Sequence, residues 1–304
     1  ELKQHLIAHL STAGHDVVDH GAVLPCADIV FVHNLATEAL RYIDRPDLRA
    51  AAQREAAWYA ELPPAVPIVA NSGLVRSALI ERFGLGPSRV RIVHPGYDPT
   101  RFDIGARPRL RALARRDLNL PERAPLLGFV TSGDLDKRGI DVFLAVAERV
   151  AAARRDARFL VVGSRRLPDV AARHPLARSG RLEHRPKSRA PERWYAALDL
   201  FLYPARFEEF GLVVAEALAM GVPVLTSRRV GAAECLPGAY AEWTADRPDP
   251  DRMTQLALTL LDDDSTRNAL VAAGLSQAPA LGGPRHVAAV LELIRGCARE
   301  KARR

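Results

Sequence analysis

Two glutamates with a fixed spacing point to chemistry in this sequence. Glu208 and Glu216 stand with seven residues between them in the stretch FEEFGLVVAEALAMGVPVLTS, which is otherwise mostly apolar. The pattern around Glu216 predicts a helix that ends at Gly221, so Glu208 lies in the loop before this helix. A carboxylate at such a place can accept two hydrogen bonds from a ribose diol, and a second one can hold a sugar hydroxyl. The alternative for Glu216 is a structural residue stabilised by the helix dipole.

A second candidate site is the turn TSGDLDKRGID, which follows an apolar run beginning near Leu126. Gly133 and Gly139 let the backbone approach a ligand closely, and the turn leads into a helix N-terminus, where free N–H groups favour anions. Lys137 and Arg138 add positive charge at the same place. These features predict a diphosphate as ligand, with a solvated loop as the alternative.

The elements that position both sites alternate regularly from Leu126 onward. Buried apolar runs separated by amphipathic helical patterns predict parallel strands joined by helical crossovers, with both sheet faces covered. Since such a sheet binds its ligand beyond the carboxyl ends of its strands, the two candidate sites should meet at one edge. The expected strands are PLLGFVTS, RFLVVGS, a weaker one around RLEHR, DLFLYPA and VPVLTS.

The first part of the chain shows the same alternation with fewer elements. We expect an abbreviated Rossmann-like domain in residues 1–105, an interdomain linker in 106–124, a second Rossmann-like domain in 125–280 and a C-terminal helix in 281–304 that crosses back to the first domain. The expected helices of the first domain are LKQHLIAHLSTAG and SGLVRSALIERFG, and its expected strands are HDVVDHGAV, ADIVFVHN, PIVANS and RVRIVHPG.

Composition favours a globular protein with an anionic partner. The 304 residues are 48% hydrophobic and 26% charged, and the formal net charge is +7. This charge favours phosphates or acidic lipids, unless it only reflects a general bias toward arginine. Nucleic acid is not expected, because no aromatic-interleaved basic strand or recognition helix is present. Cys26, Cys235 and Cys297 lack metal-ligand spacing, and their low number indicates a reducing compartment. Neither a membrane-spanning run nor a signal peptide is recognisable.

The glutamate stretch, followed by VGAAE, resembles the nucleotide-sugar signature of retaining GT-B glycosyltransferases of the family-four type. Its usual form is Glu-Gly-Phe-Gly, a Glu-Ala helix and Gly-x-Pro-Val; here Glu209 replaces the common glycine. The resemblance extends over roughly residues 28 to 275, and the spacing around SGDLDKRGID is similar to that of lipopolysaccharide-core glucosyltransferases. It implies two Rossmann-like domains and the transfer of a hexose from a nucleotide-diphosphate donor, a UDP-sugar by family frequency, to a hydroxyl acceptor such as a glycan or lipid-linked glycan.

The resemblance also assigns roles to individual residues. It implies that Glu216 holds the ribose hydroxyls, that Glu208 contacts the donor sugar and that His33 lies near sugar and acceptor. Lys137 and Arg138 would neutralise the diphosphate leaving group. Family members need no metal, so the DLD at Asp134–Asp136 is not a metal motif, and no cofactor is expected besides the donor substrate. Further implied donor-binding residues are Gly133, Phe210, Gly211, Leu212 and, beside the base, Arg185.

One departure from the family pattern concerns the N-terminal domain. The usual first strand and Gly-rich turn are missing, and only about ten residues separate HDVV from ADIVF, too few for the usual strand and helix between them. The acceptor domain is therefore expected to be incomplete or compressed: either the printed sequence omits residues of this domain, or the enzyme is a reduced form, and only a reduced form would put activity in doubt. This keeps a catalytically weak sugar-nucleotide-binding protein open, beside another GT-B reaction such as a sugar-nucleotide synthase or phosphorylase. An NAD enzyme is discounted, because VVGSRR lacks the Gly-x-Gly-x-x-Gly pattern.

The expected location is cytoplasmic. The segment RPRLRALARRDLNL combines basic residues with apolar spacing, so peripheral contact with the inner face of an anionic membrane is one interpretation. A solvated interdomain helix is the other.

Overall fold

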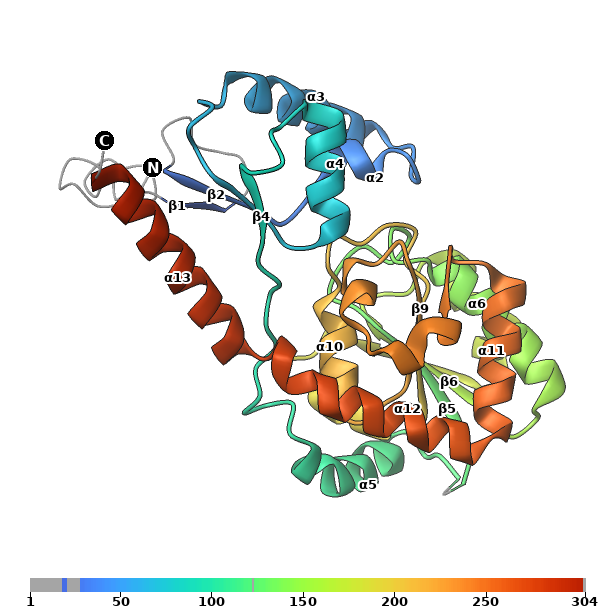
Figure 1. Ribbon diagram of the computed structural model, residues 1–304. Coiled ribbons are helices and arrows are strands. Elements are labelled where there is room, and N and C mark those ends of the chain that lie inside the picture. Colours follow the sequence, from blue (N-terminus) through green and yellow to red (C-terminus); the bar gives the residue numbers. More distant parts are fainter. Residues whose placement is uncertain (1–17, 21–27, 122, 303–304) are drawn as a thin grey trace. The chain divides into compact units, whose positions relative to one another are not determined.

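The structure is a computed structural model of the chain (Figure 1). It divides into two compact units: residues 96–283 form the second, and residues 1–95 together with 284–304 form the first. Each unit contains one fully parallel sheet, in agreement with the expected α/β class of two Rossmann-like domains. The helix expected in LKQHLIAHLSTAG lies outside the described residues, which are 18–20, 28–121 and 123–302.

The first unit has a four-stranded sheet in the order β1-β2-β3-β4. Successive side chains of a strand point to opposite faces, and β2 shows this clearly. Val30 packs in a cluster with Leu79 of α4. Ile29 and Phe31 pack on the other face with Leu293 of α13. Its elements are β1 (Val18–His20), β2 (Ile29–Val32), α2 (Ala36–Ala39), α3 (Pro46–Glu61), β3 (Ile68–Ala70), α4 (Gly73–Phe83), β4 (Val90–Ile92) and α13 (Gly283–Ala302).

The second unit has a six-stranded sheet in the order β10-β9-β8-β5-β6-β7. From β5 the chain moves outward through β6 to β7, then returns to β8 on the other side of β5. The strand order therefore reverses between β5 and β8, where doubly wound sheets bind their ligands. Its strands are β5 (Leu126–Val130), β6 (Arg158–Gly163), β7 (Leu182–Pro186), β8 (Leu200–Tyr203), β9 (Val224–Ser227) and β10 (Thr244–Ala245).

Helices cover this sheet, with α6 packed on α11 and α10 packed on α12 (Figure 1). The predicted strands are confirmed: β5, β8 and β9 are buried at every position, and the weaker RLEHR strand is β7 at the sheet edge. The helices are α5 (Arg107–Asp117), α6 (Ile140–Ala153), α7 (Asp169–Ala172), α8 (Pro175–Arg178), α9 (Glu192–Ala197), α10 (Leu212–Ala219), α11 (Pro250–Asp262) and α12 (Asp264–Gln277). Short 3-10 turns are η1 (Ile104–Ala106), η2 (Gly231–Cys235), η3 (Gly238–Trp243) and η4 (Ala278–Leu281).

The basic segment at 107–120 forms α5 and packs on α9 within the second unit. Arg107, Arg111 and Arg115 lie one turn apart and donate hydrogen bonds to the backbone carbonyls at the C-terminal end of α9. Arg107 also donates to the carbonyl of Gly221 after α10. Asp199 accepts from Arg111 at 2.6 Å and from the backbone N–H of Leu126 at 2.8 Å. Three of the five arginines in the segment are thus bound to this unit rather than exposed to a lipid surface. None of the helices in the described residues has the length and apolar character of a membrane span.

We predict that Asp199→Asn lowers the free energy of unfolding by about 1.5–3 kcal/mol, the usual contribution of hydrogen bonds to a charged group. The change removes the charge that the guanidiniums of Arg111 and Arg115 share. Urea denaturation of the whole chain measures it. Asp246→Asn is the control, because Asp246 is 93% exposed in its pair with Arg228. Equal stability of the two variants would show that the α5 contacts contribute little.

Candidate functional site

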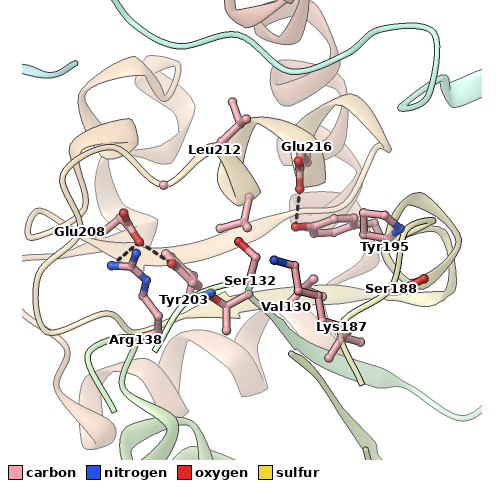
Figure 2. Close-up of a pocket in the computed structure, with 16 residues that line it drawn as sticks. Val130, Ser132, Arg138, Lys187, Ser188, Tyr195, Tyr203, Glu208, Leu212 and Glu216 are labelled. Carbon is pink, nitrogen blue, oxygen red and sulfur yellow. Dashed lines mark hydrogen bonds and ion pairs between the residues drawn. The ribbon is translucent and has the colours of Figure 1, made fainter. Parts of the chain in front are cut away.

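A cavity of about 220 Å³ lies at the carboxyl edge of the second unit's sheet (Figure 2). Liquid water occupies about 30 Å³ per molecule, so the cavity has room for a polar ligand group rather than a single solvent molecule. Residues following three strands line it, as expected at the point where the strand order reverses. They include Ser132, Gly133 and Arg138 after β5, Lys187 and Ser188 after β7, and Glu208, Gly211, Leu212 and Glu216 after β8.

Glu208 is held in the cavity wall by both its side chain and its backbone. Its Oε2 accepts from the hydroxyl of Tyr203 at 2.6 Å and pairs with Nη1 of Arg138 at 2.6 Å. Its backbone N–H donates to Arg229, and its carbonyl accepts from Gly231 in the VGAAE segment. Among the described residues, none hydrogen-bonds to Oε1. One carboxylate oxygen is therefore fixed and the other is available to a ligand.

Glu216 has the same arrangement on α10. Its Oε2 accepts from the hydroxyl of Tyr195 at 2.8 Å, and Figure 2 shows the pair at the side of the cavity opposite Glu208. The part of the chain that the structure describes offers no partner to Oε1. Each glutamate is thus oriented by one buried tyrosine, and each presents one oxygen that can accept a hydrogen bond from a ligand hydroxyl.

Burial controls the ionisation of these groups. It raises the pKa of Glu208, and the charge of Arg138 opposes this shift. Burial also raises the pKa of Glu216, opposed by the hydrogen bond from Tyr195. Burial raises the pKa of Tyr195 and Tyr203 well above the usual value, so both hydroxyls keep their protons and act as donors.

A second ion pair joins the loop after β5 to the loop after β8. The ammonium of Lys137 lies 2.7 and 2.8 Å from the two carboxylate oxygens of Glu209, and it lies 5.5 Å from the centre of the Phe207 ring. The side chain of Glu209 is only 2% exposed. Lys137 therefore neutralises the carboxylate that stands where the family motif commonly has glycine.

Two glycines allow the loop after β5 and the loop after β8 to take up their conformations. Gly139 has φ +77°, and a Cβ there would lie 2.1 Å from the carbonyl oxygen of Pro204. Gly211 has φ +91°, and a Cβ there would lie 3.0 Å from Cγ of Glu208 and 2.9 Å from Cγ1 of Val230. The left-handed backbone and the missing Cβ together let the loops approach closely enough for the ion pairs to form.

The structure brings together some of the residues predicted from sequence and separates others. Gly133, Arg138, Glu208, Gly211, Leu212 and Glu216 line the cavity. Lys137 is held by Glu209 outside this lining, and Phe210 is buried in the hydrophobic core. Arg185 bonds to Glu183 and to the carbonyl of Asp117. His33 lies after β2 in the first unit with an exposed side chain, and its role stays a prediction.

Sequence reasoning missed Tyr195, Tyr203, Lys187 and Ser188. A usable signal existed for Tyr203 and Lys187, since each stands at or directly after the carboxyl end of a strand. The apolar surroundings of both tyrosines suggested core packing instead, because nothing local in the sequence shows which buried hydroxyl meets a carboxylate.

Solved structures share this fold over most of their length. WaaG, described as a glycosyltransferase involved in lipopolysaccharide biosynthesis, is 21% identical with a TM-score of 0.74, over 92% of this chain and 79% of that chain. Anabaena Alr3699/HepE, solved with UDP and glucose, is 16% identical with a TM-score of 0.71, over 94% and 73%. The fold is therefore GT-B-like, as predicted.

Residues 124–263, which lie in the second unit, match the family model described as Glycosyl transferases group 1. The D-inositol 3-phosphate glycosyltransferase 1 of Catenulispora acidiphila is 31% identical over 75% of this chain and 56% of its own length. A GDP-mannose-dependent monoacylated alpha-(1-6)-phosphatidylinositol monomannoside mannosyltransferase of Corynebacterium glutamicum is 32% identical over 59% and 49%. The chain thus spans about half the length of the curated relatives it matches.

We predict that Gly139→Ala destabilises the second unit by about 1–3 kcal/mol more than Gly180→Ala, the usual cost of forcing an extra group into a packed site. Gly180 has φ +70° but open space around its Cβ position, so it shares the backbone strain without the clash. Urea denaturation of both variants measures the difference. Equal losses would mean that Pro204 moves aside at little cost.

We also predict that Glu216→Gln changes how stability depends on pH. In the folded protein the pKa of Glu216 lies above its ordinary value of 4.5. Below pH 4.5 the carboxyl is therefore protonated in both the folded and the unfolded state, and the stabilities of wild type and variant should depend on pH in the same way. As pH rises from 4.5 through the folded pKa, ionising the buried carboxyl lowers the stability of the wild type relative to the variant. Denaturation of both proteins at several pH values checks this. A constant difference would contradict the raised pKa.

Proposed function

We propose that this chain takes part in a retaining glycosyl transfer, moving a hexose from a UDP-sugar to a hydroxyl acceptor without a metal ion. The observation that carries the proposal is the pair Glu208 and Glu216 in one cavity. Each is oriented by a buried tyrosine and presents one oxygen, and Arg138 lies beside Glu208. The match of residues 124–263 to the group 1 glycosyltransferase model supports this use of the site.

In the proposed donor complex, Glu216 accepts hydrogen bonds from the ribose hydroxyls and Glu208 accepts one from the sugar. The diphosphate lies between them, near Gly133 and the first residues of α10. Leu212 and Val213 at the start of α10 line the cavity, so their backbone N–H groups are placed to favour phosphate oxygens.

Uracil is the base we propose for the donor. The support is the solved HepE complex with UDP and glucose, which shares this fold. The relative from Corynebacterium glutamicum is named for GDP-mannose instead, so guanine is the base to compare. The acceptor we propose is a glycan or lipid-linked glycan; the named relatives are described for D-inositol 3-phosphate and for a phosphatidylinositol mannoside.

The proposed reaction follows from where charge develops. The bond between the anomeric carbon and the diphosphate oxygen breaks, which leaves positive charge on the sugar and negative charge on the leaving group. Fixed positive groups such as Arg138 stabilise that negative charge without reorganising at the moment of reaction. The leaving phosphate takes the proton of the acceptor hydroxyl, and the acceptor oxygen bonds to the same face of the sugar.

A sugar-nucleotide-binding protein with weak catalysis is the second candidate. The observation that favours it is the neutralisation of both predicted cations, Lys137 by Glu209 and Arg138 by Glu208. Turnover distinguishes the two candidates: release of UDP from a UDP-hexose in the presence of acceptor supports transfer, whereas tight binding without release supports the second.

Isothermal titration of UDP, GDP and ADP into the full chain tests the proposed donor site. We expect UDP to bind most tightly and Glu216→Ala to weaken it by about 1–3 kcal/mol, the scale for losing hydrogen bonds to a charged group. Glu148→Ala is the control, because Glu148 is exposed on α6 and does not line the cavity. If no nucleotide binds, or if Glu216→Ala binds UDP as tightly as wild type, the proposal is wrong.

A further inference from the structure

The cations near the cavity differ in whether a carboxylate of the protein already pairs with them. Four residues with formal charge line it in the described structure: Arg138, Lys187, Glu208 and Glu216. Arg138 is paired with Glu208 at 2.6 Å, and Glu216 accepts from the neutral hydroxyl of Tyr195. Within the described ranges, no carboxylate pairs with the ammonium of Lys187. Lys187 thus supplies the one positive charge in this lining that is not already balanced.

The position of Lys187 follows from the sheet. It is the first residue after β7, which ends at Pro186 at the same carboxyl edge as β5 and β8. Its side chain is exposed and points into the cavity (Figure 2). A lysine acts on phosphate as a compact point charge on a flexible stem, so it can follow a ligand that a rigid guanidinium could not reach.

Lys137 is bound in a different way. Both carboxylate oxygens of Glu209 contact its ammonium, the side chains of the pair are 14% and 2% exposed, and its backbone carbonyl accepts from the N–H of Arg206. Freeing Lys137 for a ligand would leave the carboxylate of Glu209 buried without its counter-ion, which is strongly unfavourable. The pair therefore acts as a fixed link between the two loops.

We propose that Lys187, together with Arg138, binds the diphosphate of the donor, and that Glu209 keeps Lys137 as a structural residue. This inference rests on the proposed function, because it concerns the same donor. A nucleoside diphosphate brings at least two negative charges into a lining whose formal charges otherwise cancel. Among the described residues that line the cavity, Lys187 is the cation that can neutralise these negative charges without breaking an existing ion pair.

The test compares UDP, UMP and uridine by isothermal titration into the full chain and its variants. We expect Lys187→Met to weaken UDP binding about 10- to 100-fold, the factor for losing a charge-assisted hydrogen bond. Uridine binding should stay nearly unchanged, and Lys187→Arg should retain most of the UDP affinity. Raising the salt concentration should weaken UDP binding to wild type more than to Lys187→Met, because screening acts on the added charge.

The matched comparison is the double variant Lys137→Met/Glu209→Gln, which removes both charges of the buried pair and so leaves no uncompensated ion. Thermal denaturation first establishes that it folds. We expect it to bind UDP nearly as tightly as wild type, because the Arg138–Glu208 pair still joins the two loops and holds the cavity wall. If the double variant loses as much UDP affinity as Lys187→Met, Lys137 contributes to donor binding and its assignment as a structural residue is wrong.

The remaining outcomes are also decisive. If Lys187→Met weakens uridine as much as UDP, Lys187 contacts the nucleoside and the inference is wrong. If Lys187→Met binds UDP like wild type while Glu216→Ala does not, this inference fails and the proposed function stands. If wild type binds neither these ligands nor the guanine series GDP, GMP and guanosine, both fail together.

Discussion

Charged side chains that leave water must be paired, and this constraint organises the second unit. The loop after β5 carries two adjacent cations, and the loop after β8 carries two adjacent carboxylates. Lys137 pairs with Glu209, and Arg138 pairs with Glu208. Because breaking one such pair leaves an uncompensated buried charge, the two loops hold each other in one arrangement. That arrangement fixes the wall of the cavity on which Glu208 lies.

The same constraint explains why both glutamates that face the cavity have a tyrosine beside them. A carboxylate in a partly dry site needs hydrogen bonds to its charged form, and a neutral hydroxyl supplies one without adding charge. Tyr203 at the end of β8, the strand before the loop of Glu208, donates to Glu208, and Tyr195 of α9 donates to Glu216. One oxygen of each carboxylate is consumed in this way, which sets the direction in which the other can receive a ligand.

The arginine content has a more structural meaning than its net charge suggests. A charge of +7 fits an anionic partner, yet Arg107, Arg111 and Arg115 bind backbone carbonyls of their own unit. Arg181 does the same at the start of β7, where it reaches the carbonyls of Ala151 and Arg154. A guanidinium has five donors in a fixed plane, so it can satisfy several carbonyls at a loop or helix end at once. The net charge of a chain therefore says little about its partners until the arginines with a structural role have been identified.

The sequence by itself determined the class of fold and the two loops that form the site. Apolar periodicity and glycine stops are local signals, so the strands β5 to β9, the helix α10 and the left-handed Gly221 at its end could be anticipated from short stretches. The interval between Glu208 and Glu216 is local too, and the two residues line one cavity.

Only the tertiary structure decided which cations face that cavity. Lys137 and Glu209 are 72 positions apart, and Tyr195 and Glu216 are 21 apart, so no window of sequence shows that they meet. Adjacent residues such as Lys137 and Arg138 look equivalent in a motif, yet they point to different partners across the loop. Lys187 reaches the cavity because β7 ends at the same edge of the sheet as β5 and β8. Pairing of distant side chains depends on how strands are ordered in space, and that order is settled only when the sheet forms.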